Sequence, residues 1–67
     1  MANTAAELSS LATAVDEITR RITAHAEAAE AQKDEEVASE LFAIERSLTS
    51  ANRRLARLTV ALGRRSA

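Results

Sequence analysis

His25 is the residue of this chain best suited to proton exchange near neutral pH, and it is the only histidine among 67 residues. An imidazole can act as a general base, bind a metal ion or change its charge with pH. The first two roles need partner groups, but the chain has no Cys, no second His and no Glu-x-x-His motif. It also has no Gly-rich phosphate loop, since Gly63 is its only glycine. The sequence therefore predicts a protein that is not an enzyme and holds no metal and no cofactor.

Arginines near the C-terminus form a second group with binding potential: Arg53, Arg54, Arg57, Arg64 and Arg65. Guanidinium groups bind phosphate oxygens, so nucleic-acid binding is one interpretation. The net charge of −1 and the absence of interleaved aromatic residues weaken it. In one helix-pairing register, Asp16 and Glu17 are expected to face Arg53 and Arg54, which would neutralise part of the cluster.

Size and composition favour a small helical protein that needs a partner. A chain of 67 residues is at most one small domain, and such domains usually need disulfides, a metal or oligomerisation to become stable. Without Cys, oligomerisation or docking onto another chain remains. Pro is absent and the good helix formers Ala, Leu, Glu and Arg dominate. The eight Arg against one Lys are typical of a small protein from a high-GC bacterial genome.

Two series of apolar residues follow the heptad steps of three and four that mark a coiled-coil stripe. The first comprises Leu8, Leu11, Val15, Ile18, Ile22, His25, Ala29 and Gln32. The second comprises Val37, Leu41, Ile44, Leu48, Ala51, Leu55, Leu58 and Leu62. Between Gln32 and Val37 the step is five, which would move the stripe by about 140° around a continuous helix. The chain is therefore expected to break there.

The predicted fold class is all-α, an antiparallel two-helix hairpin in one domain over residues 1–67. Helix 1 is expected at about 4–32, the turn at 33–34, helix 2 at about 35–62 and a basic tail at 63–67. Thr4 with Glu7 predicts a capping box, Asp34 an N-cap and Gly63 a helix C-terminus. One long helix that pairs with a second copy is the alternative, because residues 24–40 contain no strong helix breaker.

The two stripes are expected to face each other in the hairpin, in one of two registers. Leu8 lies opposite Leu62 in the first register and opposite Leu58 in the second. Small residues on the flanks of helix 1 would let a further helix approach: Ala5, Ala12 and Ala26 on one side, Ala14 and Ala28 on the other. His25 falls on the stripe, where a structural role is the simpler expectation. Phe42, the only aromatic residue, lies beside the stripe and would pack on a third helix or anchor another protein.

Two helices enclose no core, so each stripe residue keeps an edge exposed unless another chain covers it. The expected partner is a second copy in a four-helix bundle, and a further protein is expected as well. Residues 1–36 carry a net charge of −5 and residues 37–67 a net charge of +4, which would favour head-to-tail packing. The charges also suit the helix dipoles and a solvated surface, which is the plainer interpretation.

The sequence thus predicts a homo-oligomeric helical hairpin that serves as an adaptor, scaffold or small accessory subunit. The predicted interface comprises Leu8, Leu11, Val15, Ile18, Ile22, His25, Leu41, Phe42, Ile44, Leu48, Leu55, Leu58 and Leu62. The alternatives are a nucleic-acid-binding hairpin dimer that uses the arginine cluster, and a small regulator that sequesters one specific protein. No membrane span is expected, because no apolar run approaches about 20 residues. The absence of Cys fits a reducing cytoplasm.

Overall fold

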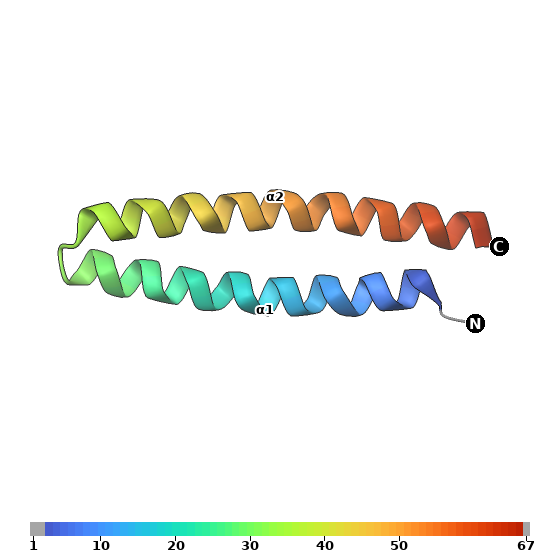
Figure 1. The fold of residues 1–67 in the computed structure, drawn as a ribbon, viewed down its shortest axis with the longest axis horizontal. Coiled ribbons are helices and arrows are strands. Elements are labelled where there is room, and N and C mark those ends of the chain that lie inside the picture. The colour runs from blue at the N-terminus through green and yellow to red at the C-terminus, as the bar shows by residue number, and fades with distance from the viewer. Residues whose placement is uncertain (1–2, 67) are drawn as a thin grey trace.

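The computed structural model describes residues 3–66 as two long helices, α1 (Thr4–Ala31) and α2 (Glu35–Ser66). The helices run antiparallel and side by side, joined by a short turn at one end (Figure 1). The Cα atoms extend over 51 × 16 × 11 Å, so the hairpin is long, two helices wide and one helix thick. The all-α hairpin predicted from the sequence is confirmed, and the alternative of one long helix is wrong.

Helix α1 begins with Asn3 as its N-cap, one residue before the predicted capping box. Asn3 is extended (φ −91°, ψ 95°), and its Oδ1 accepts a hydrogen bond of 3.1 Å from the backbone N–H of Ala6. Its carbonyl accepts the first helical bond from the N–H of Glu7, at 2.9 Å. Thr4 is already helical, so the predicted role of Thr4 as the cap is wrong. An Asn side chain caps a helix N-terminus at least as well as Thr.

The turn combines a helix C-cap with a helix N-cap. Lys33 adopts a left-handed conformation (φ 63°), its N–H donates to Glu30 and the N–H of Asp34 donates to Ala29. These two bonds are the Schellman pattern that satisfies the last carbonyls of a helix. Asp34 then caps α2, since its carbonyl accepts from Ala38 at 3.0 Å and its Oδ1 from Val37 at 3.4 Å. The predicted N-cap at Asp34 is confirmed.

Helix α2 extends four residues beyond its predicted end at residue 62. Gly63 is helical and has no positive φ, so its predicted role as a C-terminal cap is wrong. A single Gly costs a helix only about 1 kcal/mol relative to Ala. Arg64 and Arg65 lie in the last turn of α2, where cations interact favourably with the helix dipole. Residues 63–66 of the predicted basic tail therefore continue the helix, and residue 67 lies outside the described residues.

Small and polar residues form the contact between α1 and α2, which we call the inner seam. Its most buried members are Ala26, Ala29, Ala38 and Thr19, with 0%, 9%, 5% and 9% of their surface exposed. The seam follows heptad steps on both helices. Ala5, Ala12, Thr19 and Ala26 of α1 face, in this order, Thr59, Asn52, Glu45 and Ala38 of α2, all buried or half-buried. Of the alanines predicted to admit a further helix, Ala5, Ala12 and Ala26 admit α2 itself, whereas Ala14 and Ala28 are exposed.

The inner seam is rotated from the predicted seam by one heptad position. Every second predicted residue, such as Leu8, Val15 and Leu48, stays half-buried at the edge of the contact. The others face outward: Leu11, Ile18, Ile44 and Leu58 expose 55%, 50%, 37% and 49% of their surface. Alanines let the helix axes approach more closely than leucines would. The larger side chains are thereby left for another contact.

Candidate partner-binding face

A broad apolar surface covers one side of the hairpin. We call it the apolar face; it comprises Leu8, Leu11, Val15, Ile18 and Ile22 of α1, with Leu41, Ile44, Leu48, Ala51, Leu55, Leu58 and Leu62 of α2. All of these residues are half-buried or exposed within the protomer. The structure thus gathers all but two of the predicted interface residues, His25 and Phe42, into this set.

The geometry of antiparallel helices places the two stripes on the same side. On α1 each exposed stripe residue precedes an inner-seam residue, as Leu11 precedes Ala12; on α2, Leu58 precedes Thr59 in the same way. Each residue of a right-handed helix points about 100° away from the next one, always counter-clockwise of it when the helix is viewed from its N-terminus. Because the helices run in opposite directions, this equal rotation turns both stripes toward one broad face of the hairpin.

The protomer has almost no core of its own. Among residues 3–65, the buried apolar side chains are the alanines Ala26, Ala29 and Ala38, and no large side chain is fully buried. Soluble monomers rarely expose contiguous apolar patches of more than a few hundred Å². The broad side of the hairpin measures 51 × 16 Å between Cα atoms, and the apolar face runs along it on both helices.

His25 continues the stripe of α1 toward the turn and is exposed to solvent. It lines a shallow hollow with Ile18, Arg21 and Ile22, all from the same helix. In residues 3–66, no three His, Asp or Glu side chains come together in a way that could hold a metal ion. His25 therefore borders the apolar face as a polar group beside its leucines and isoleucines.

Phe42 lies away from the apolar face. It is half-buried and lines a hollow beside the turn with Glu30, Lys33 and Ala38. On α2 it follows Leu41, which rotates it past the inner seam toward the opposite side of the hairpin. In this position Phe42 covers the turn, and the structure does not join it to the other predicted interface residues.

The arginines of α2 lie along its exposed side. From residue 46 to residue 66 the chain carries six Arg and no acidic residue. Arg46, Arg53, Arg54, Arg57, Arg64 and Arg65 are all exposed. The only ion pair among residues 3–66 joins Arg20 to Asp16 within α1, so none of these six is neutralised inside the protomer.

The hydrogen bond from Arg20 to Asp16, with the charge of Asp16, raises the pKa of Arg20. The predicted pairing of Asp16 and Glu17 with Arg53 and Arg54 is absent from the described residues. Asp16 pairs with Arg20 on its own helix, and the bond between Asn52 and Ala12 sets a register in which Asp16 lies level with residues more than one turn before Arg53.

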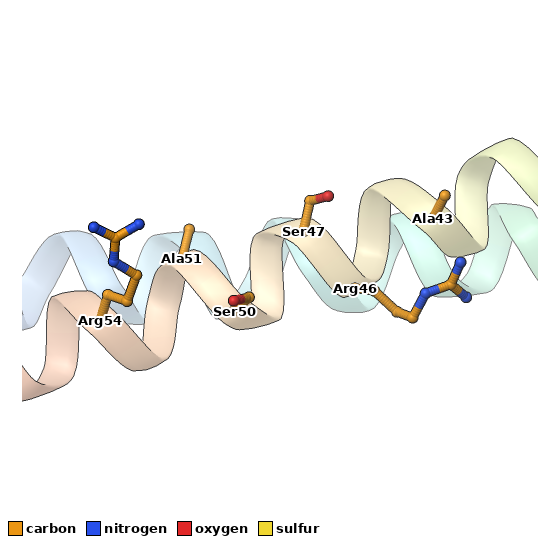
Figure 2. A pocket seen from close by; sticks show the side chains of 6 residues that line it. All are labelled: Ala43, Arg46, Ser47, Ser50, Ala51 and Arg54. Atoms are coloured by element: carbon orange, nitrogen blue, oxygen red, sulfur yellow. The ribbon is translucent and has the colours of Figure 1, made fainter.

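A shallow hollow runs along α2 at the border of the apolar face. It is lined by Ala43, Arg46, Ser47, Ser50, Ala51 and Arg54. Figure 2 shows the small side chains of Ala43, Ser47 and Ala51 in a row, with Arg54 beside one end of it. Such a row lets the backbone of another helix come close, and Arg54 offers that helix a positive charge.

No known family model, curated protein or solved structure matches this chain. The apolar face and the charges around it are therefore the grounds on which a role can be assigned. Neither helix, over the residues described, is long and apolar enough to cross a membrane.

Asn52 is a seam residue that the sequence interpretation did not single out. Its Nδ2 donates a hydrogen bond of 3.1 Å to the carbonyl oxygen of Ala12 on α1. A signal was present, because Asn52 shares a heptad position with Ala38, Glu45 and Thr59. That second series of small and polar residues is the one that faces α1.

Proposed function

We propose that the protein is a non-enzymatic interaction module that associates with copies of itself through the apolar face, and that it serves as a scaffold, adaptor or small accessory subunit. One observation supports this proposal: most of the large apolar side chains of the described residues lie on one broad face, with Phe42 and Val60 outside it, while the most buried residues of the contact inside the hairpin are small or polar.

Burial of that face is the main source of stability open to the chain. Complete burial of a Leu or Ile side chain contributes about 1.5–3 kcal/mol, and burial of an Ala contributes far less. A second copy would add the apolar face of another hairpin and close a four-helix bundle, in which both faces leave water together. Two-fold dimers are the commonest symmetric oligomers, and they need only one self-complementary patch. The absence of Cys supports a reducing cytoplasm as the place where the module works.

The test compares two Asp substitutions on α2 by sedimentation equilibrium. Leu58 and Val60 expose 49% and 54% of their surface, so they are matched in exposure and differ in which side of the helix they occupy. Leu58→Asp places a charge in the apolar face and is expected to dissociate the assembly into monomers. Val60→Asp lies outside that face and is expected to leave the mass unchanged. Equal masses for the two variants would refute the apolar face as the interface.

The exposed arginines favour a second candidate, which is binding to nucleic acid. Residues 46–66 carry six Arg and no acidic residue, and none of these Arg forms an ion pair in the described protomer. Such a surface suits a phosphate backbone. Fluorescence anisotropy with labelled RNA and DNA at 50 and 200 mM salt tests this role. A steep loss of affinity with salt that is abolished by Arg53→Ala with Arg57→Ala would support it. No binding at low salt would exclude it.

A regulator that sequesters one specific protein predicts a different behaviour of the isolated chain. Such a chain would be largely unfolded alone and would fold on its partner. Circular dichroism of the purified protein separates the two, since the self-associating module is expected to be almost fully helical.

A further inference from the structure

We propose that two copies pair through their apolar faces with their turns at opposite ends, so that Glu40 of each copy lies against Arg54 of the other. This arrangement rests on the self-association proposed above and specifies the partner as a second copy in one orientation. Three features of the described residues support it: the charge distribution along the hairpin, the row of small residues on α2 and the spacing of Glu40 and Arg54.

Two-fold symmetry allows two ways to pack the apolar faces. With the axis parallel to the hairpin, both turns lie at the same end and α1 of one copy packs on α2 of the other. With the axis across the hairpin, the turns lie at opposite ends and each helix packs on its own counterpart. In both arrangements all neighbouring helices run antiparallel, so the helix dipoles do not select between them. Side-chain charge and shape therefore select between the two arrangements.

The charge of the hairpin is strongly divided along its length. The segment around the turn, residues 24–44, carries Glu27, Glu30, Asp34, Glu35, Glu36 and Glu40 against Lys33, a net charge of −5. The rest of the chain carries eight Arg and four acidic residues, a net charge of +4. With the turns at the same end, the two segments of net charge −5 would lie side by side. With the turns at opposite ends, the segment of net charge −5 in each copy lies beside the part of the other copy that carries the net charge of +4, at both ends of the dimer.

Helix α2 is suited to pack on its own counterpart. Its residues 35–45 carry four acidic residues and no basic one, whereas residues 46–66 carry six Arg and no acidic one. An antiparallel pair of α2 helices therefore sets an acidic segment against a basic segment twice. The row Ala43, Ser47 and Ala51 supplies the small side chains that a close helix–helix contact needs, and it borders the apolar face (Figure 2).

Ser47 marks the position of the two-fold axis. Glu40 and Arg54 each lie seven residues from Ser47, on the same side of α2 and both exposed. When two antiparallel α2 helices cross at Ser47, Glu40 of one copy comes level with Arg54 of the other. Ile44 and Ala51 flank Ser47 at three and four residues, so a large side chain meets a small one in the same layer. The axis level with Ser47 also falls near the middle of α1, so the hairpins overlap along most of their length.

Distance measurement between spin labels tests the orientation directly, and the chain is suited to it because it has no Cys. The label is attached to Ala31→Cys, an exposed position at the turn end of α1. A 28-residue helix is about 42 Å long, so turns at opposite ends predict a separation of about 40 Å. Turns at the same end predict a separation below about 30 Å, which is the width of a four-helix bundle with its labels. The short distance would overturn the orientation and leave self-association intact, whereas a monomeric mass would overturn both.

Cross-linking and charge exchange give a second readout. Ser47→Cys is expected to cross-link to its counterpart with a short bismaleimide. The control Ser39→Cys lies about 24 Å from its own counterpart and is not expected to cross-link.

Glu40→Arg is expected to weaken dimerisation about tenfold, because both symmetric pairs become repulsive. Adding Arg54→Glu restores the pairs with reversed sign, and the affinity is expected to return to within about threefold of the original. A double variant that is weaker than Glu40→Arg alone would contradict the predicted pair.

Discussion

The side-chain amide of Asn52 donates a hydrogen bond of 3.1 Å to the backbone carbonyl of Ala12 and so ties α2 to α1. This bond decides the register of the hairpin. If Leu8 lay opposite Leu62, Asn52 would lie opposite Ile18; if Leu8 lay opposite Leu58, it would lie opposite Ala14. Ala12 is two residues from Ala14 and six from Ile18, so the bond places the hairpin close to the second register, a choice that the heptad pattern alone left open.

Replacement of Asn52 by Leu is expected to stabilise the protein. Among the described residues, Asn52 Oδ1 is buried and has no hydrogen-bond partner, and an unsatisfied buried acceptor costs about 1–3 kcal/mol. Ala12 lies within α1, so its carbonyl keeps its helical partner when the amide is removed. Urea unfolding followed by circular dichroism, at one fixed protein concentration, should show a gain of about 1–2 kcal/mol in the free energy of unfolding. A loss of more than about 1 kcal/mol would mean that the amide is a net stabilising contact.

Replacement of Lys33 by Gly should stabilise the turn. Lys33 has a φ of 63°, a conformation that costs a residue with a Cβ about 1–2 kcal/mol and costs Gly little. Gly loses more backbone entropy on folding, so the expected net gain is about 0.5–1 kcal/mol, visible as a higher melting temperature. Gln32→Gly is the matched control, since Gln32 has a φ of −86° and should lose stability. If both glycines destabilised the protein, the left-handed turn at Lys33 would be incorrect.

Enlargement of Ala26 tests the close contact of the inner seam. Ala26 is 0% exposed, so Leu at this position has no room and should lower the free energy of unfolding by about 1–3 kcal/mol. Ala24 is exposed on the same helix, and Ala24→Leu should be neutral within about 0.5 kcal/mol. Equal effects in the two variants would mean that α1 does not face α2 through its alanines.

Charges placed where the seam meets the apolar face should disrupt both contacts. Ile22 and Leu48 are half-buried at that edge, so Ile22→Asp or Leu48→Asp would bury an unpaired carboxylate in the assembled protein. Each variant is expected to lose most of its helicity at low micromolar concentration. Full helicity by circular dichroism, together with an unchanged mass, would show that these positions stay in water.

The heptad pattern was sufficient to predict two antiparallel helices and their turn, and the capping preference of Asp predicted the cap at Asp34. The heptad pattern misplaced the contact between the helices, because Ala5, Ala12 and Ala26 carry too little hydrophobicity to stand out beside the leucines. The larger stripe is the stronger signal in the sequence, and the structure leaves it facing outward. Local signals also misled at Gly63, where a residue that often ends helices lies within one, beside two arginines suited to a helix C-terminus. The Schellman turn at Lys33 gave no sequence signal, since Gly or Asn usually occupies that position.

The solution mass of the unmodified protein tests self-association through the apolar face most directly. Because the chain has no Trp or Tyr, its mass is best measured by light scattering with refractive-index detection during size-exclusion chromatography. At low micromolar concentration the expected mass is twice the 7.2 kDa of the chain, with circular dichroism showing nearly complete helicity. A fully helical monomer of 7.2 kDa would contradict the account, since the apolar face would then be stable in water without a second copy.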